Sequence, residues 1–144
     1  RKTQMPTRWI DQGAEEAIVV VEVPNRYLAG ITEVALKNHF ADKTNWRKML
    51  TNTYDAVDLV QEKAKVQAWL PDEVREYFSL EKNEIIAMHY PVAAYPTKVN
   101  SLNLDKTPFY QGQLIGVKGQ YLLFQDGTVF NVRSYEGYVV QIAI

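Results

Sequence analysis

The side chains best suited to chemistry lie in the first forty residues: Arg8, Trp9, Asp11, Gln12, Glu33 and His39. An arginine can stabilise a phosphate group or a developing oxyanion. A single carboxylate can hold Mg²⁺ or Mn²⁺, because Mg²⁺ keeps several waters and takes one or two protein carboxylates. Arg8 and Glu33 are therefore the pair whose types suit phosphate chemistry, with Glu33 as the candidate metal ligand.

The same pair also allows a structural interpretation. Glu33 and Lys37 are four residues apart, in the order that favours an ion pair on a helix, and Arg8 can pair with Asp11. Spacing alone favours these ion pairs over a catalytic role. His39 and His89 are the two histidines of the chain, and neither has a second His or Cys at metal-ligand spacing.

Two predicted elements open the chain. Residues 6–12 form a short helix, because Pro6 suits a first turn and Gly13 can end a helix. The run from Ala17 to Val23 is nearly all apolar and rich in β-branched residues. This pattern predicts a central strand that is buried on both faces.

A helix over residues 26–40 is predicted next, with Asn25 as its N-cap. Its apolar residues fall on two sides, which predicts packing on both sides. Arg26, Glu33 and Lys37 form a polar strip between them, open to solvent or to a ligand. Arg26, Lys37 and His39 are the candidate nucleic-acid contacts of this helix.

The strand from Ala17 to Val23 has no predicted neighbour within the first 80 residues. An open apolar edge recruits another strand. We therefore expect it to pair with a second copy of the chain or with a remote strand of the second half. The first alternative gives a symmetric homodimer and is favoured here by the long helical segment that follows; the second keeps a monomer.

A change in composition near residue 80 predicts two domains, residues 1–80 and 81–144. Further helices are predicted in the first domain, at residues 46–50, 55–70 and 71–78. Short β-prone runs punctuated by glycines predict a small antiparallel β-barrel-like module in the second. These runs are residues 84–90, 98–104, 113–119, 120–125, 128–133 and 137–144. Asp126-Gly127 separates two of them and predicts a two-residue hairpin turn.

The second half is also rich in aromatic residues. They suit a stacking platform for single-stranded nucleic acid, although barrel core and rim positions are the commoner explanation. The residues are Phe109, Tyr110, Tyr121, Phe124, Phe130, Tyr135 and Tyr138. Lys118 and Arg133 are the cations close to them in sequence, which is few for a track that binds phosphates.

Composition excludes several classes. The 16 basic and 17 acidic residues give a net charge of -1, so no global basic field indicates a nucleic-acid partner. The absence of cysteine excludes disulfides and thiolate metal sites. No apolar run approaches the roughly 20 residues of a membrane span, and no signal peptide opens the chain. The sequence therefore predicts a cytoplasmic protein without a membrane partner. Its start at Arg1-Lys2 indicates a fragment or a processed product.

Two stretches of the first half carry a family resemblance. TRWIDQGA at residues 7–14 and ITEVALKNHF at residues 31–40 resemble the back half of a GIY-YIG nuclease domain. In that domain a hairpin with the GIY and YIG motifs precedes a helix with an arginine, a strand, and a helix with a metal-binding glutamate. The resemblance implies catalytic roles for Arg8 and Glu33, with His39 near the end of the same helix.

The hairpin and its tyrosines are not in this sequence. The resemblance therefore implies an α+β protein with an incomplete GIY-YIG-like α/β portion, extended by helices and followed by the β module. It implies no nuclease activity for this chain and no cofactor in it, with Mg²⁺ or Mn²⁺ expected in a complete domain.

The whole chain, including GVKGQYLLF at residues 116–124 and NVRSYEGY at residues 131–138, is similar to the C-terminal part of an uncharacterised bacterial family of unknown function. The first function hypothesis is a domain of unknown function that binds nucleic acid and is related to GIY-YIG phosphodiesterases. The alternative is a non-catalytic structural or protein-interaction module, in which Arg8 and Glu33 form surface ion pairs.

Overall fold

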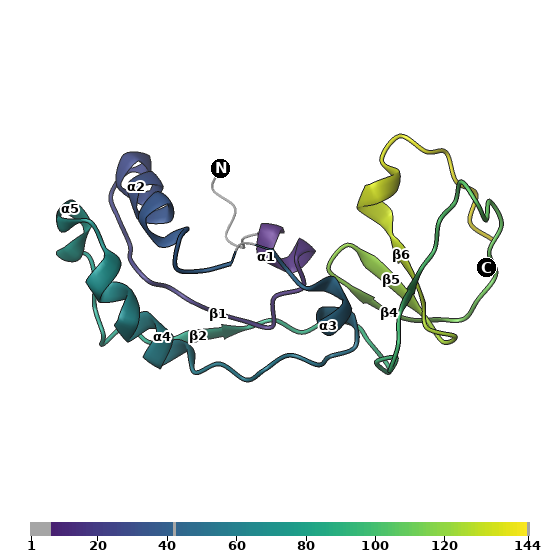
Figure 1. The fold of residues 1–144 in the computed structure, drawn as a ribbon, viewed down its shortest axis with the longest axis horizontal. Coiled ribbons are helices and arrows are strands. Elements are labelled where there is room, and N and C mark those ends of the chain that lie inside the picture. The colour runs from purple at the N-terminus through teal and green to yellow at the C-terminus, as the bar shows by residue number, and fades with distance from the viewer. Residues whose placement is uncertain (1–6, 42, 144) are drawn as a thin grey trace. The chain divides into compact units, whose positions relative to one another are not determined.

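The structure is a computed structural model that describes residues 7–41 and 43–143. Five α-helices and two sheets lie in this part of the chain, which confirms a mixed α+β class. The chain forms two compact units, each assembled from separate stretches of sequence. The helical unit comprises residues 15–44 and 55–88, and the β unit comprises residues 1–14, 45–54 and 89–144 (Figure 1). The predicted domains, residues 1–80 and 81–144, remain a prediction.

The helical unit is built around a two-stranded antiparallel ribbon. Its elements are β1 (Glu16–Ile18), α2 (Arg26–Leu36), α4 (Leu59–Val66), the 3-10 turn η1 (Gln67–Trp69), α5 (Asp72–Arg75) and β2 (Ile85–Ala87). β1 pairs with β2 so that Ala17 lies opposite Ile86. Val66, Leu70 and Val74 form the buried core of this unit.

The strand predicted from Ala17 to Val23 is shorter than expected. β1 ends at Ile18, and beyond it Val21 makes an isolated bridge to Phe78. Val19 is 40% exposed, so the prediction of a central strand buried on both faces is wrong. The later valines pack against the core of α4 and α5 instead of continuing the strand. β1 thus pairs with β2, a strand of the second half of the chain, which is the second of the two predicted alternatives. The homodimer remains a prediction.

The second helix, α2, starts where the sequence predicts it. Asn25 is the N-cap, and its side-chain oxygen accepts a hydrogen bond from Leu28 N at 3.0 Å. The helix ends at Leu36, before the predicted residue 40, and a turn follows in which His39 N and Phe40 N both donate to Leu36 O. Tyr27 and Val34 are 66% and 71% exposed. Leu28, Ile31 and Leu36 pack against the core of this unit, so both predicted apolar sides of α2 are covered only in part.

The helix α4 begins later than the predicted residue 55. Asp58 is its N-cap and accepts hydrogen bonds from Val60 N and Gln61 N, both at 3.0 Å. Within α4, Lys63 is only 2% exposed, and its ammonium donates to the backbone carbonyl of Lys82. Burial, and then the nearby charge of Lys82, lowers the pKa of Lys63.

The β unit contains a four-stranded sheet with the strand order β3-β6-β5-β4. Its elements are α1 (Thr7–Asp11), α3 (Trp46–Leu50), β3 (Asn100–Ser101), β4 (Leu114–Lys118), β5 (Tyr121–Phe124), β6 (Thr128–Asn131) and the 3-10 turn η2 (Val132–Tyr135). β4, β5 and β6 form an antiparallel meander, and β3 pairs in parallel with β6.

This sheet does not close into a barrel within the described residues. β3 and β4 are the outermost strands, with Val92 making an isolated bridge to Gly116 on the outer side of β4. The predicted last strand, residues 137–143, has no strand structure in the described part. The predicted barrel is therefore corrected to an open sheet. One face of it packs on α3: Met49 and Leu50 join Leu123 and Val129 in a buried core, and alternate residues of β5 supply this face.

The predicted hairpin at Asp126-Gly127 exists but is longer by one residue. β5 already ends at Phe124, so Gln125 joins the turn, which Gly127 N closes by donating to Phe124 O at 3.0 Å. Gly127 has φ +83°, the left-handed conformation. A three-residue hairpin loop requires this conformation at its last residue, and glycine adopts it readily. The two-residue turn of this sheet is Gly119-Gln120, between β4 and β5.

Charge divides sharply between the two units. The β unit carries nine basic and four acidic residues, a net charge of +5, and the helical unit carries seven basic and 13 acidic residues, a net charge of -6. Sequence order hides this difference because the segments of the two units alternate along the chain. In the described part of the chain, no helix is long and apolar enough to cross a membrane.

Candidate functional site

The candidate nucleic-acid contacts Arg26, Lys37 and His39 all lie in the helical unit. Arg26, Glu33 and Lys37 are exposed, and Glu33 forms no ion pair with Lys37 in the described part of the chain. His39 stacks on the indole of Trp69, with ring centroids 4.0 Å apart and planes within 6°. One face of the His39 ring is therefore covered by Trp69 while the residue stays exposed, and its role as a nucleic-acid contact remains a prediction.

The pair Arg8 and Glu33 is divided between the units. The backbone of Arg8 lies in α1 of the β unit, and its side chain lies outside the described residues. Glu33 lies in the helical unit. Within the described residues, no group of three or more His, Asp or Glu side chains is placed to hold a metal ion. The roles predicted for Arg8 and Glu33 therefore remain predictions.

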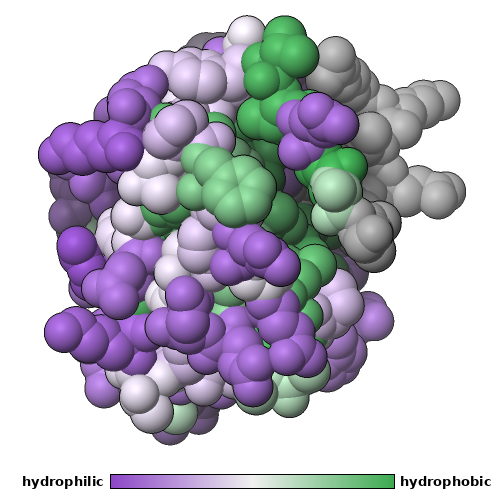
Figure 2. Space-filling model, turned by 90° about the vertical axis from the view of Figure 1, so that its right-hand side faces the viewer, coloured by the Kyte–Doolittle hydropathy of each residue, from purple (hydrophilic) through white to green (hydrophobic). Residues whose placement is uncertain are grey.

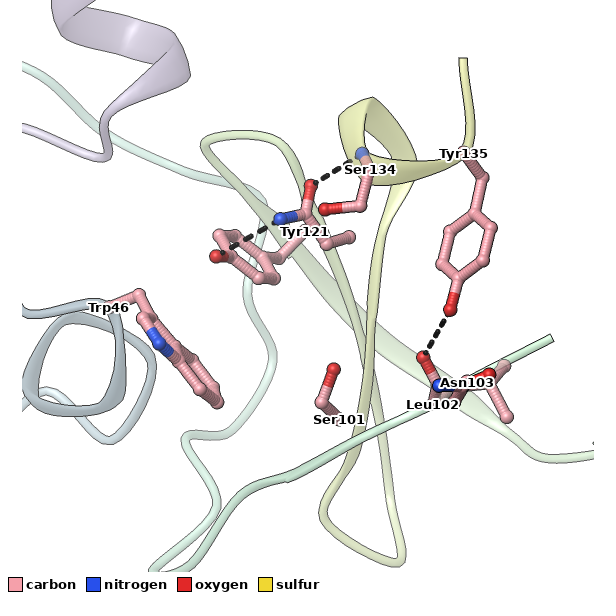
Figure 3. Close-up of a pocket in the computed structure, with 8 residues that line it drawn as sticks. Trp46, Ser101, Leu102, Asn103, Tyr121, Ser134 and Tyr135 are labelled. Carbon is pink, nitrogen blue, oxygen red and sulfur yellow. Dashed lines mark hydrogen bonds between the residues drawn. The ribbon is translucent and has the colours of Figure 1, made fainter. Parts of the chain in front are cut away.

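A pocket of about 330 Å³ lies within the β unit, where α3, β3, β5 and η2 meet (Figure 3). Pockets for small ligands start at about this size. Three aromatic rings and a set of uncharged polar side chains line it. The lining residues are Trp46, Ser101, Leu102, Asn103, Tyr121, Asn131, Ser134 and Tyr135.

Trp46 reaches this pocket from the first turn of α3. Asn45 caps the helix by accepting a hydrogen bond from Lys48 N at 3.2 Å. The indole of Trp46 is stacked near the ring of Tyr121, with centroids 5.8 Å apart and planes within 12°. The guanidinium of Arg47 lies 4.4 Å from the centroid of the Trp46 ring, a cation–π contact that brings a positive charge beside the pocket.

Asn131 connects β6 to η2 and fixes one end of the pocket. Its side-chain oxygen accepts hydrogen bonds from Arg133 N at 3.2 Å and Ser134 N at 3.3 Å. Its amide nitrogen donates to the hydroxyl of Tyr121 at 3.3 Å. This asparagine therefore holds the start of the turn and one of the three aromatic rings together.

Tyr135 stands on the other side of the pocket from Trp46 (Figure 3). Its hydroxyl donates to Leu102 O at 3.2 Å and accepts from Leu104 N at 3.1 Å. Its ring stacks on Phe130, with centroids 5.2 Å apart. These contacts lock both the ring and the hydroxyl of Tyr135, so the pocket wall is preorganised.

The ring of Tyr138 makes an edge-to-face contact with the ring of Tyr135, and the two ring centroids are 5.2 Å apart. The hydroxyl of Tyr138 donates to Asp105 at 2.7 Å. This hydrogen bond to a carboxylate, followed by the charge of Asp105, raises the pKa of Tyr138. Tyr138 therefore stays a neutral donor at physiological pH.

Several polar groups of the pocket are available to a ligand. In the described part of the chain, the hydroxyls of Ser101 and Ser134 make no hydrogen bond. Asn103 accepts from Asp105 N and Lys106 N through its side-chain oxygen, which leaves its amide NH₂ group as a donor. The pocket can therefore stack a flat ring and hydrogen-bond its polar edge, with no formal charge in its lining.

Lys118 is completely buried in the β unit and does not belong to this pocket. Its ammonium lies 4.8 Å from the ring of Tyr95, 5.5 Å from that of Tyr90 and 5.8 Å from that of Tyr54. The hydroxyl of Tyr95 also lies 3.4 Å from it. Lys118 is therefore packed in a cage of tyrosines, and burial keeps its ammonium away from solvent.

Comparison with known proteins identifies the family. The model of a family described as "Protein of unknown function (DUF2797)" matches residues 1–140. The chain belongs to this family. No curated protein and no solved structure matches the chain.

In this DUF2797 chain, sequence reasoning identified Tyr121 and Tyr135 as two of seven aromatic candidates but missed Trp46. Trp46 lies 75 residues before Tyr121 in sequence, and the two rings meet only because α3 packs on the sheet. The available signal was the asparagine before the helix, because Asn45 predicts an N-cap and so places Trp46 in the first turn of that helix.

Proposed function

We propose that this DUF2797 chain binds single-stranded nucleic acid, with one unpaired base held in the aromatic pocket of the β unit. The observation that carries the proposal is the set of rings formed by Trp46, Tyr121 and Tyr135, bordered by uncharged hydrogen-bonding groups. Base stacking on such rings contributes about 1–3 kcal/mol per base and tolerates any sequence.

The charge of the β unit supports a polyanionic ligand. Its net charge is +5, whereas that of the helical unit is -6. The unit that holds the pocket is therefore the one that attracts phosphate groups. Arg47 and Arg133 are exposed and flank the pocket, one beside Trp46 and one in η2. Duplex nucleic acid is a poorer ligand, because its bases are not free to stack on protein rings.

The test is a fluorescence anisotropy titration of a labelled single-stranded octamer with the full chain at low salt. We expect Trp46→Ala to weaken binding about 5- to 150-fold, the equivalent of one lost stacking contact. Trp9→Ala is the matched control, since Trp9 is an exposed tryptophan of the same unit outside the pocket. Binding that is equally tight to a duplex, or unchanged in Trp46→Ala, would contradict the proposal.

Because Trp46 also packs on the core of the β unit, Trp46→Phe provides a second variant that keeps an aromatic ring. This variant is expected to fold and to bind. Quenching of tryptophan emission by the oligonucleotide should disappear in it, because Trp9 and Trp69 do not line the pocket. Quenching that persists in Trp46→Phe would place the ligand elsewhere.

The relation to GIY-YIG phosphodiesterases leads to a separate expectation. Glu33 is a single exposed carboxylate, which gives weak metal affinity, and the sequence lacks the hairpin tyrosines that help activate water in those enzymes. We therefore expect supercoiled plasmid to remain intact after incubation with this chain and Mg²⁺ or Mn²⁺. Metal-dependent nicking that Glu33→Ala abolishes would overturn this expectation.

A protein-interaction module is the second candidate, and exposed apolar side chains favour it. On the face of the β unit shown in Figure 2, a strip of hydrophobic side chains runs between hydrophilic ones. Exposed apolar residues near the C-terminal end of the unit include Tyr138, Val139 and Ile142, at 51%, 101% and 77% exposure. A chain that binds no oligonucleotide would favour this alternative. The homodimer and a cytoplasmic location accompany either proposal as predictions.

A further inference from the structure

A second, larger pocket adjoins the first one in the β unit. Its volume is about 560 Å³, and Tyr121 and Tyr135 line both pockets. A chain of nucleotides that fills the first pocket can therefore continue past these two rings into the second. The second pocket differs in its chemistry, because three charged residues, Asp11, Arg133 and Glu136, are among those that line it.

Asp11 is held at this pocket by the packing of α1. Tyr90 donates from its hydroxyl to Ala14 O at 2.8 Å and to Ile10 O at 3.3 Å, which ties down the end of the helix. The turn after β4 comes equally close: a Cβ on Gly119 would lie 2.6 Å from the carbonyl oxygen of Asp11. The last residue of α1 is thus fixed beside the β4–β5 turn.

Arg133 of η2 and Glu136, the residue after η2, also line the second pocket. Asn131 starts this turn by accepting from Arg133 N, and Glu136 follows Tyr135 directly. In the described part of the chain, Arg133 and Glu136 form no ion pair with each other or with Asp11. The guanidinium can therefore neutralise a phosphate while the carboxylates accept hydrogen bonds.

Building on the proposed function, we propose that the second pocket holds the neighbouring nucleotide and selects a base with an exocyclic amino group. Carboxylates accept hydrogen bonds from the amino group of cytosine and are repelled by a carbonyl oxygen at the same position, as in uracil. Cytosine and uracil share one ring size, so the preference concerns hydrogen bonding and leaves stacking almost unchanged. Arg133 meets the phosphate between the two nucleotides.

The test compares labelled dC8 and dU8 octamers in anisotropy titrations with the full chain. We expect dC8 to bind about fivefold tighter or more, the lower limit for a specific base contact. The ratio of the dC8 affinity to the dU8 affinity should fall in Glu136→Gln. It should approach one in the double variant Asp11→Asn, Glu136→Gln, because an amide can donate to the carbonyl of uracil as well as accept from the amino group of cytosine. Glu81→Gln, which removes the same charge from the helical unit, is the matched control and should keep the ratio.

The outcomes separate this inference from the proposed function. If dC8 and dU8 bind equally well and Trp46→Ala weakens both, the base selection is wrong and the stacking pocket stands. If the preference for dC8 persists in the double variant, the two carboxylates are not its cause, and the inference is overturned. If neither octamer binds the wild-type chain, both proposals fail.

Discussion

Replacing Lys118 by glutamate is expected to unfold the β unit. The ammonium of Lys118 is completely buried and faces the rings of three tyrosines. The face of an aromatic ring is electron-rich, so it attracts a cation and repels a carboxylate. Because solvent does not reach this position, water cannot stabilise the carboxylate of the variant. An uncompensated buried charge of this kind lowers the free energy of unfolding by about 3–5 kcal/mol.

Thermal denaturation of the full chain, followed by circular dichroism, measures this effect. Lys106→Glu is the matched control, since it makes the same change of charge at an exposed position of the same unit. Lys106→Glu should melt close to the wild-type temperature, and Lys118→Glu should lack the transition of the β unit. Equal melting temperatures of the two variants would show that the tyrosine cage does not need a cation.

Replacing Gly127 by valine is expected to destabilise the β unit by about 2 kcal/mol or more, through two separate effects. At φ +83° a β-branched side chain is strained. In addition, a Cβ at this position would lie 2.6 Å from the carbonyl oxygen of Lys98. The backbone there would have to move, and with it the hydrogen bond from Asn100 N to Gly127 O that leads into β3.

Gly137→Val separates the two effects. Gly137 has φ +91°, but nothing lies within 4 Å of the Cβ that would be added. This variant therefore carries the strain without the close contact, and its loss of stability in a denaturant titration should be the smaller one. A loss in Gly127→Val that does not exceed that in Gly137→Val would mean that the contact with Lys98 has no cost.

Local features of this protein follow from its sequence. Asn25 predicts the start of α2 because an N-cap needs only an acceptor three residues before a backbone N–H, and that hydrogen bond is present. Helix α3 at residues 46–50 and the left-handed conformation of Gly127 are equally local. In each case the interaction partners lie within four residues, so propensity and turn chemistry decide the outcome.

The boundaries and partners of the strands depend on distant residues. The apolar run from Ala17 to Val23 was compatible with a long central strand, but the strand β1 ends at Ile18. Beyond it, Val20, Val21 and Val23 pack against the core beside α4 and α5, and Val19 is exposed. Periodicity describes which residues avoid water. It does not distinguish burial in a sheet from burial under helices, because both remove the same apolar surface.

The candidate site was decided by tertiary structure. Sequence identified the aromatic residues and the cations of the second half, but Trp46 joins Tyr121 and Tyr135 only through the packing of α3 on the sheet. The same packing buries Lys118 among tyrosines. It also groups alternating segments into units of net charge +5 and -6, from a sequence whose total is -1. Electrostatic attraction depends on distance in space, so only the fold determines where a polyanion is attracted.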